Sequence, residues 1–151
     1  MVEDVNQCVE AEASGADRLE LCGPGDGGLT PHIDIIRETL EKVNIPTHVM
    51  IRPRAGDFNY SDDEFKQMIQ SVNEVKATGA AGVVFGILKE DKTLDTDRMR
   101  VLIEAAHPMR IVCHKAFDET PNGLDAINEL IKLGVKEVLT SGHAKTAAEG
   151  A

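Results

Sequence analysis

Charged residues interrupt three short apolar runs of this 151-residue chain, and they fall late in each run. Successive side chains of a strand point to opposite faces, so Glu20 shares a face with Cys22, and Arg52 and His114 each lie on one defined face of their own runs. A strand buried on both faces is apolar at nearly every position, so these charges indicate a ligand or a charged partner. A carboxylate and an imidazole can exchange protons with a substrate, and a guanidinium binds anions. Glu20, Arg52 and His114 are therefore our candidate catalytic residues.

Further polar residues follow two of these runs. Arg54 adds a second cation close to Arg52, while Lys115 and Asp118 come shortly after His114. Two neighbouring guanidinium groups suit a carboxylate or a phosphate. We therefore predict a ligand-binding set of Arg52, Arg54, Lys115 and Asp118. We also expect a carboxylate beside His114 that raises the pKa of its imidazole above the ordinary value of about 6.5.

Structural interpretations of the same residues stay open. Arg52 could be neutralised by Glu20 or Asp57, and His114 could be a hydrogen-bonded histidine of the core. The segment 22–28 is rich in glycine, which lets backbone amides approach an anion. It lacks the glycine spacing of a dinucleotide site and the lysine of a phosphate-binding P-loop, so neither function is indicated.

Gly and Pro breaks divide the chain into units that would position these residues. The breaks recur about every 30 residues, which is the length of one strand with its crossover helix. Each break is followed by a short apolar run, and the five predicted strands are residues 17–22, 47–53, 82–88, 110–117 and 136–141. Parallel strands joined in this way form an α/β fold, and polar residues late in barrel strands meet at the C-terminal mouth.

Helix signals alternate with the predicted strands. Residues 3–13 form an amphipathic helix with no strand before it, and Thr30 with Pro31 is a typical helix start. Ser61 and Glu64 have the spacing of a capping box. A further helix opens at Thr96 or the residue before it, and another precedes the glycine at position 134.

Composition narrows the classes of partner. The chain has 16 basic and 26 acidic residues and a net charge of −10, which argues against nucleic acid and anionic membranes as partners. No run approaches the length of a membrane span. Three cysteines without paired spacing indicate reduced thiols and a cytoplasmic location.

Several segments together resemble the copper homeostasis protein CutC family. They are GADRLELC, HVMIRPRAGDFNYS, VVFGILKEDKTLD, CHKAFDET and VLTSG, in this order. The resemblance implies a TIM (βα)8-type barrel and a cytoplasmic, often dimeric protein that binds Cu(I). It implies that Cys22 is a metal ligand. It also implies that the barrel mouth carries the polar residues Glu20, Arg52, Arg54, His114 and Asp118. Against the family pattern, residues 1–151 are a single partial barrel domain of about five parallel strands, units two to six, without the first strand and the last two βα units.

Two functions remain open at this point. A third interpretation is that the chain is a folding fragment without activity of its own. In one, the protein is a Cu(I) binder, since Cu(I) prefers sulfur ligands and His48, Met50 and Cys22 share the interior face. In the other, it is a barrel enzyme acting on a small anionic metabolite. Across these alternatives, the expected ligand is a copper ion or a small anion, and neither nucleic acid nor a membrane is expected as a partner. The chain is also expected to associate with copies of itself as a homo-oligomer.

Overall fold

A five-stranded parallel sheet forms the centre of the molecule, in a computed structural model that describes residues 1–25 and 27–151. Asp26 of the glycine-rich segment lies outside the described residues. The strands follow chain order, and each pairs in parallel with the next. They are β1 (Leu19–Leu21), β2 (Thr47–Met50), β3 (Gly82–Phe85), β4 (Arg110–Cys113) and β5 (Glu137–Val138).

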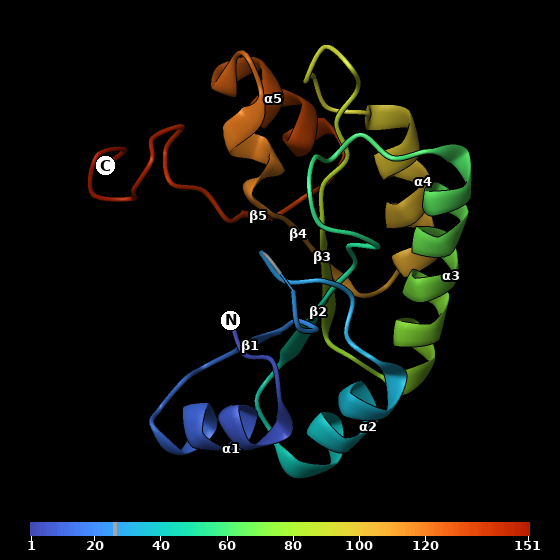
Figure 1. The fold of residues 1–151 in the computed structure, drawn as a ribbon, viewed down its shortest axis with the longest axis vertical. Coiled ribbons are helices and arrows are strands. Elements are labelled where there is room, and N and C mark those ends of the chain that lie inside the picture. Colours follow the sequence, from blue (N-terminus) through green and yellow to red (C-terminus); the bar gives the residue numbers. More distant parts are fainter. Residues whose placement is uncertain (26) are drawn as a thin grey trace.

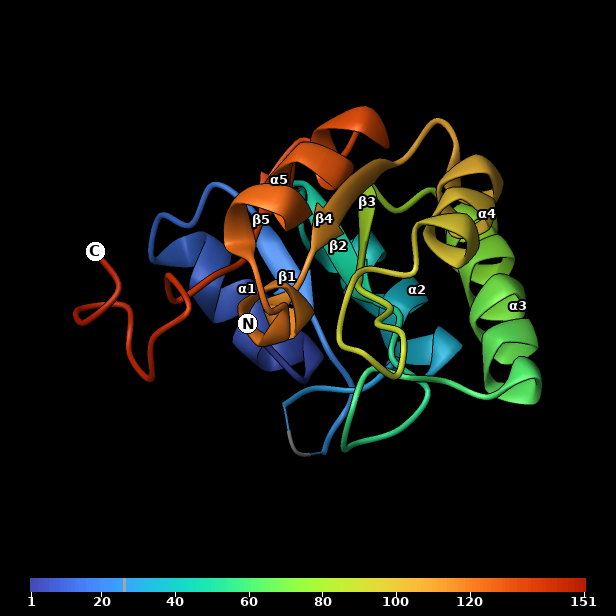
Figure 2. The ribbon, with the colours of Figure 1, turned by 90° about the horizontal axis from the view of Figure 1, so that it is seen from above.

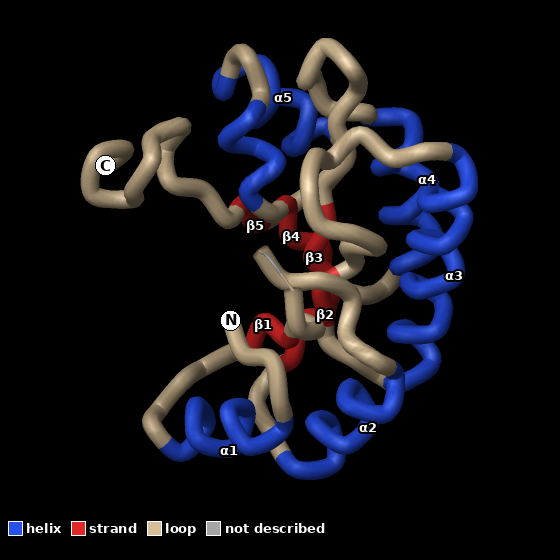
Figure 3. The backbone as a smooth tube through the Cα atoms, viewed as in Figure 1, coloured by secondary structure: helices blue, strands red, loops and turns tan. Residues whose placement is uncertain are grey.

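Helices cover the convex side of this sheet (Figures 1 and 3). The helices follow one another around the outside of the strands, and both chain ends lie on the open side. They are α1 (Val5–Ala13), α2 (Ile33–Lys42), α3 (Asp62–Thr78), α4 (Thr96–Ala106) and α5 (Gly123–Lys132). The short 3-10 helix η1 (Lys115–Glu119) follows β4. This arrangement confirms the predicted α/β fold, an incomplete barrel of five parallel strands with outer helices.

The two faces of the sheet carry different clusters. The larger cluster packs between strands and helices and includes Leu21, Val49 and Phe85. The smaller cluster lies on the opposite, interior face and consists of Cys22, Met50, Val84 and Val112. The alternation within the strands therefore separates a helix-packing face from an interior face, as the sequence predicted for β1, β2 and β4.

A short stretch of chain pairs with the outer edge of β1. Val2 forms an isolated parallel bridge with Leu21, in which Val2 N donates to Glu20 O at 3.0 Å and Cys22 N donates to Val2 O at 2.9 Å. The sequence predicted no strand before α1, and among the described residues Val2 forms only this isolated bridge, not a strand. A single bridge has too few residues for the periodicity that identified the other strands.

Several predicted boundaries moved, and all five strands are shorter than predicted. The helix start predicted at Thr30 lies at His32, whose Nδ1 accepts a hydrogen bond from Asp34 N, because Thr30 Oγ1 instead accepts one from Arg52 N at 2.8 Å. The predicted strand 110–117 ends at Cys113, because His114 caps η1, which begins at Lys115. Ser61 and Glu64 do form the predicted capping box of α3, and α4 starts after Asp95.

Candidate functional site

A cavity of about 620 Å³ opens at the C-terminal ends of the strands. Arg52, His114 and Leu139 lie just after β2, β4 and β5, and the segments that follow β1 and β2 extend from the same end of the sheet (Figure 2). We call this the mouth cavity. Its lining residues are Met1, Arg18, Glu20, Gly27, Met50, Arg52, Phe58, His114, Lys115 and Leu139. The structure thus brings the three candidate catalytic residues to one cavity.

Arg52 is a buried cation in the wall of the mouth cavity, with 7% of its surface exposed. Its Nη2 atom donates to Gly56 O at 2.9 Å, and its guanidinium lies 5.0 Å from the centre of the Phe58 ring. A cation over an aromatic face and against carbonyl oxygens is held in one orientation. The positive charge of Arg52 therefore has a fixed position beside His114.

His114 is a neutral imidazole in the same wall. Its Nδ1 atom accepts a hydrogen bond from Ala116 N at 3.2 Å, so the neutral ring carries its proton on Nε2. The ring packs against Phe58, with centroids 4.7 Å apart, and Nε2 is buried without a hydrogen-bond partner among the described residues. Burial, with the charge of Arg52, lowers the pKa of His114 to about 3. Our expectation of a raised pKa was wrong, because an aromatic ring and a cation stand where a carboxylate was predicted.

The close packing of His114 depends on a glycine. A side-chain carbon on Gly86 would lie 2.9 Å from both Cε1 and Nδ1 of the His114 ring. Such a distance is well inside normal contact, so any larger residue at position 86 would displace the imidazole. Gly86 directly follows β3, and its bare backbone sets the position of the ring.

Glu20 is the acidic group of the mouth cavity. Burial raises the pKa of its carboxyl group, while the N-terminal ammonium group and Arg18 act in the opposite direction. Desolvation favours the neutral form of a carboxylic acid, which moves its pKa towards neutral pH. Glu20 can therefore give or take a proton more readily than an exposed carboxylate.

Lys115 and Asp118 of η1 differ in position. Lys115 lines the mouth cavity, and its Nζ atom lies 3.2 Å from Ser141 Oγ. Asp118 does not line it: its carboxylate accepts hydrogen bonds from Ser141 N at 2.9 Å and His143 N at 3.0 Å, and one from the Thr140 hydroxyl. Asp118 therefore fastens the segment after β5 next to the mouth.

Arg54 lies outside the lining of the mouth cavity. Its Nε atom is 2.6 Å from Glu64 Oε1, Nη2 lies 3.0 Å from Asp57 Oδ1 and 2.8 Å from Asn59 O, and the guanidinium covers the Tyr60 ring. These bonds occupy both edges of its planar group. This geometry favours a structural role in holding segment 55–60, so Arg54 has no part in our proposal for the ligand.

Cys22 lies beneath the mouth, in the interior cluster with Met50. A side-chain carbon on Gly28 would be 2.9 Å from Cys22 Sγ and 3.3 Å from Met1 Sδ, so both sulfur atoms approach the same glycine. Burial and the neighbouring Glu20 raise the pKa of the Cys22 thiol to about 12. Within the described part of the chain, no three His, Cys, Asp or Glu side chains are grouped to hold a metal ion.

Several residues of the mouth were not among the sequence-predicted ones. Phe58 falls inside the conspicuous motif at residues 50–60, and the alternation of charged and apolar residues could have indicated Arg18. Met1 and Leu139 reach the cavity only through the curvature of the sheet, which no local pattern encodes.

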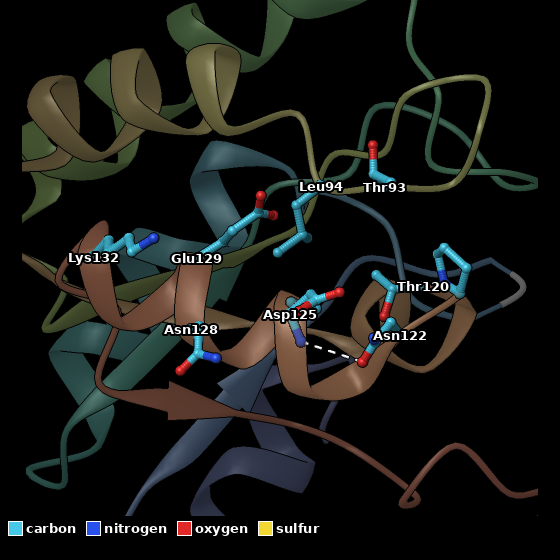
Figure 4. Close-up of a pocket in the computed structure, with 10 residues that line it drawn as sticks. Thr93, Leu94, Thr120, Asn122, Asp125, Asn128, Glu129 and Lys132 are labelled. Atoms are coloured by element: carbon cyan, nitrogen blue, oxygen red, sulfur yellow. Dashed lines mark hydrogen bonds between the residues drawn. The ribbon is translucent and has the colours of Figure 1, made fainter.

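A second hollow, of about 380 Å³, lies between α5 and the segment before α4 (Figure 4). It is lined by loops and by α5 residues such as Asp125 and Glu129, and by none of the candidate residues. Among the described residues that line it, no buried polar side-chain atom lacks a hydrogen-bond partner, so nothing there marks a ligand site. We therefore place the candidate site at the mouth cavity.

Parallel strands with outer helices define a βα-barrel type of protein, and the polar residues at the strand ends are its candidate site. The CutC family model matches residues 1–151, and the chain belongs to the CutC family. A family protein CutC from Mesorhizobium japonicum is 45% identical over 150 residues, which are 99% of this chain and 58% of the relative. The chain thus spans less than two thirds of that curated relative.

Solved structures agree with this assignment. A Streptococcus agalactiae protein provisionally named copper homeostasis protein CutC superposes with a TM-score of 0.92 at 30% identity, covering 99% of this chain and 75% of that one. An aldolase, QR15, gives a TM-score of 0.62 at 15% identity, covering 96% of this chain and 63% of that one, a likeness of fold alone. Among the described residues, no helix is both long and apolar enough to cross a membrane.

Proposed function

We propose that the mouth cavity binds a small organic oxyanion and that Glu20 exchanges a proton with it. The observation that carries this proposal is the buried Nε2–H of His114, which has no hydrogen-bond partner among the described residues. A buried donor without a partner is unfavourable by about 1–3 kcal/mol, so a ligand oxygen at this position would recover that free energy.

The proposed roles follow from the chemistry of each group. Arg52 supplies a fixed positive charge, and neutral His114 donates a hydrogen bond to a carbonyl or carboxylate oxygen. Glu20, with its raised pKa, acts as the proton acceptor or donor. Lys115 supplies a second cation at the rim. Met50, Phe58 and Leu139 contact the apolar part of the ligand.

Citrate and inorganic phosphate serve as probes, with binding measured by calorimetry on the whole chain. His114→Asn keeps an acceptor for Ala116 N but removes the Nε2–H, so citrate should bind about tenfold more weakly. His114→Gln places an amide donor near the Nε2 position and should recover part of the affinity. His32→Asn is the matched control, because His32 caps α2 in the same way at an exposed position. Unchanged citrate affinity in His114→Asn would refute the proposal.

Glu20→Gln separates binding from proton transfer. Removing the negative charge should leave citrate binding equal or tighter, because the carboxylate repels the anion. Weaker binding would instead mean that the Glu20 carboxyl group itself holds the ligand.

Cu(I) binding is the second candidate function, favoured by the approach of the Cys22 and Met1 sulfur atoms to Gly28 with Met50 in the same cluster. We propose that Cys22 is the thiolate ligand and that affinity is weak, since its proton must first be displaced. Competition with bicinchoninate should show weaker binding in Cys22→Ser and Met50→Leu, with Cys113→Ser as the buried control. Equal affinity in all of these variants would exclude the sulfur site.

The cellular setting and assembly complete the proposal. We place the protein in the cytoplasm, because its three free cysteines are typical of a reducing compartment. We further propose that residues 1–151 form one partial barrel domain that associates with copies of itself. Sedimentation of the purified chain tests the association.

A further inference from the structure

A third cavity, of about 550 Å³, lies at the opposite end of the strands from the mouth. Its walls come from the starts of β2, β4 and β5 and from the end of α4. We call it the base cavity. Four polar side chains line it, and these are His48, His107, Arg110 and Lys136. The apolar side chains of Ile103, Met109 and Ile111 line it as well.

His48 is the buried polar group of the base cavity. Only 2% of this residue is exposed, and its Nδ1 atom has no hydrogen-bond partner among the described residues. Its ring lies against Gly82 of β3, where a side-chain carbon would be 2.7 Å from Cδ2 and 2.9 Å from Nε2. The ring is thus held in place, with one nitrogen still lacking the partner that a buried polar atom requires.

The charge around His48 is positive. Arg110 Nε lies 3.1 Å from Glu137 Oε1, and Arg18 pairs with the same carboxylate. Two guanidinium groups therefore share one carboxylate, and Lys136 adds a further cation with no ion pair among the described residues. None of the described residues lining the base cavity is Asp or Glu, although the chain carries a net charge of −10. An anion is the ligand that this local excess of positive charge would attract.

We propose that the base cavity binds a small organic anion, a phosphate or carboxylate with an apolar body. The anionic group would lie between Arg110 and Lys136 and contact His48 Nδ1, because a guanidinium and an ammonium group both bind phosphate and carboxylate oxygens. The apolar body would contact Ile103, Met109 and Ile111. This site is separate from the mouth cavity and does not depend on the function proposed there.

The test uses phenyl phosphate and inorganic phosphate as probes of the whole chain, followed by NMR of the histidine ring signals. Phenyl phosphate should shift the His48 signals in a saturable manner and bind more tightly than inorganic phosphate, because its ring occupies the apolar wall. Parallel shifts of the His114 signals would report any separate binding at the mouth.

Lys136→Gln should weaken phenyl phosphate binding severalfold, and Arg110→Gln should weaken it further. Arg100→Gln is the matched control, because Arg100 is an exposed arginine of α4 paired with Asp97 and lies outside the lining. Lys136 is exposed, so its variant should keep the thermal midpoint of the parent protein. Unmoved His48 signals, or an equal loss of affinity in Lys136→Gln and Arg100→Gln, would overturn the proposal.

Discussion

Two buried imidazoles, those of His48 and His114, pack against opposite ends of β3. His48 packs against Gly82 at the start of β3, and His114 packs against Gly86, which directly follows β3. Each ring has one nitrogen without a hydrogen-bond partner among the described residues. Burial lowers the pKa of both rings, so both are neutral at physiological pH. A neutral imidazole donates or accepts a hydrogen bond without adding charge, which distinguishes these residues from the arginines beside them.

Cys22 should be chemically inert in the folded protein. The reactive species of cysteine is the thiolate, and burial together with Glu20 raises the pKa of this thiol to about 12. We expect a thiol-specific reagent at pH 8 to label none of the three cysteines quickly under native conditions. All three should react in denaturant, since each is fully buried in the fold. Rapid labelling of one native thiol, absent in Cys22→Ser, would contradict this.

Sequence alternation located the interior residues but not their partners. It placed Glu20, Arg52 and His114 correctly on one face, because strand geometry fixes side-chain direction every second residue. It could not foresee that Phe58, from a loop, would pack on His114, or that Arg54 would turn to Glu64. Those contacts depend on loop conformation, which local periodicity does not determine.

At the scale of elements, η1 connects the mouth to the segment after β5. The pKa of Asp118 is lowered: its burial would raise it, but hydrogen bonds from Thr140, Ser141 and His143 outweigh that effect. A lowered pKa in the folded state stabilises the fold above the unfolded value of about 3.9, and this stabilisation is lost as the pH falls through the folded value.

Asp118→Asn should therefore reduce the free energy of unfolding at pH 7 by about 1–3 kcal/mol. The difference from the parent protein should shrink as the pH is lowered towards 3. Urea unfolding at several pH values measures it, with the exposed Asp125→Asn as the control. A difference that stays constant with pH would mean that the charge of Asp118 plays no part.

The capping box of α3 makes a second prediction at this scale. Glu64 N donates to Ser61 Oγ at 3.2 Å, and Ser61 N donates to Glu64 Oε2 at 2.8 Å. Ser61→Ala should lower the free energy of unfolding by about 1 kcal/mol, whereas Ser71→Ala within the same helix should change it little. Urea midpoints compare the two, and equal midpoints would show that the cap does not limit stability.

The order of elements was predictable from sequence, but their ends were less so. Gly and Pro breaks such as Gly79, which adopts the left-handed conformation after α3, mark the units reliably. The end of β4 and the start of α2 differ from the predicted positions, because His114 and His32 use their imidazoles as helix caps. Histidine is an uncommon cap, so the sequence gives little signal for it.

At the scale of the whole molecule, an ion pair between Arg18 and Glu137 joins the first and last strands of the sheet across its concave side. Arg110 of β4 shares the same carboxylate. These charges come from units separated by most of the chain, so they stabilise the curvature of the incomplete barrel rather than any one element.

A double-mutant cycle with Arg18→Met and Glu137→Gln measures this contribution. Because Arg18 is partly exposed, we expect a coupling free energy of about 0.2–1 kcal/mol. Glu137→Gln alone should destabilise more than Arg18→Met, since it leaves two arginines without their shared partner. If the two changes in the free energy of unfolding simply add, the ion pair contributes nothing to holding the strands together.

Gly82 and Gly86 give the molecule two internal reporters. Each presents an α-hydrogen where a side chain would otherwise stand, directly against the edge of a histidine ring. The magnetic shielding of that hydrogen depends on the orientation of its ring, so its resonance responds to any ligand that rotates the imidazole. Glycine labelling can therefore record the occupancy of the base cavity through Gly82 and of the mouth cavity through Gly86, in a single spectrum and without any substitution.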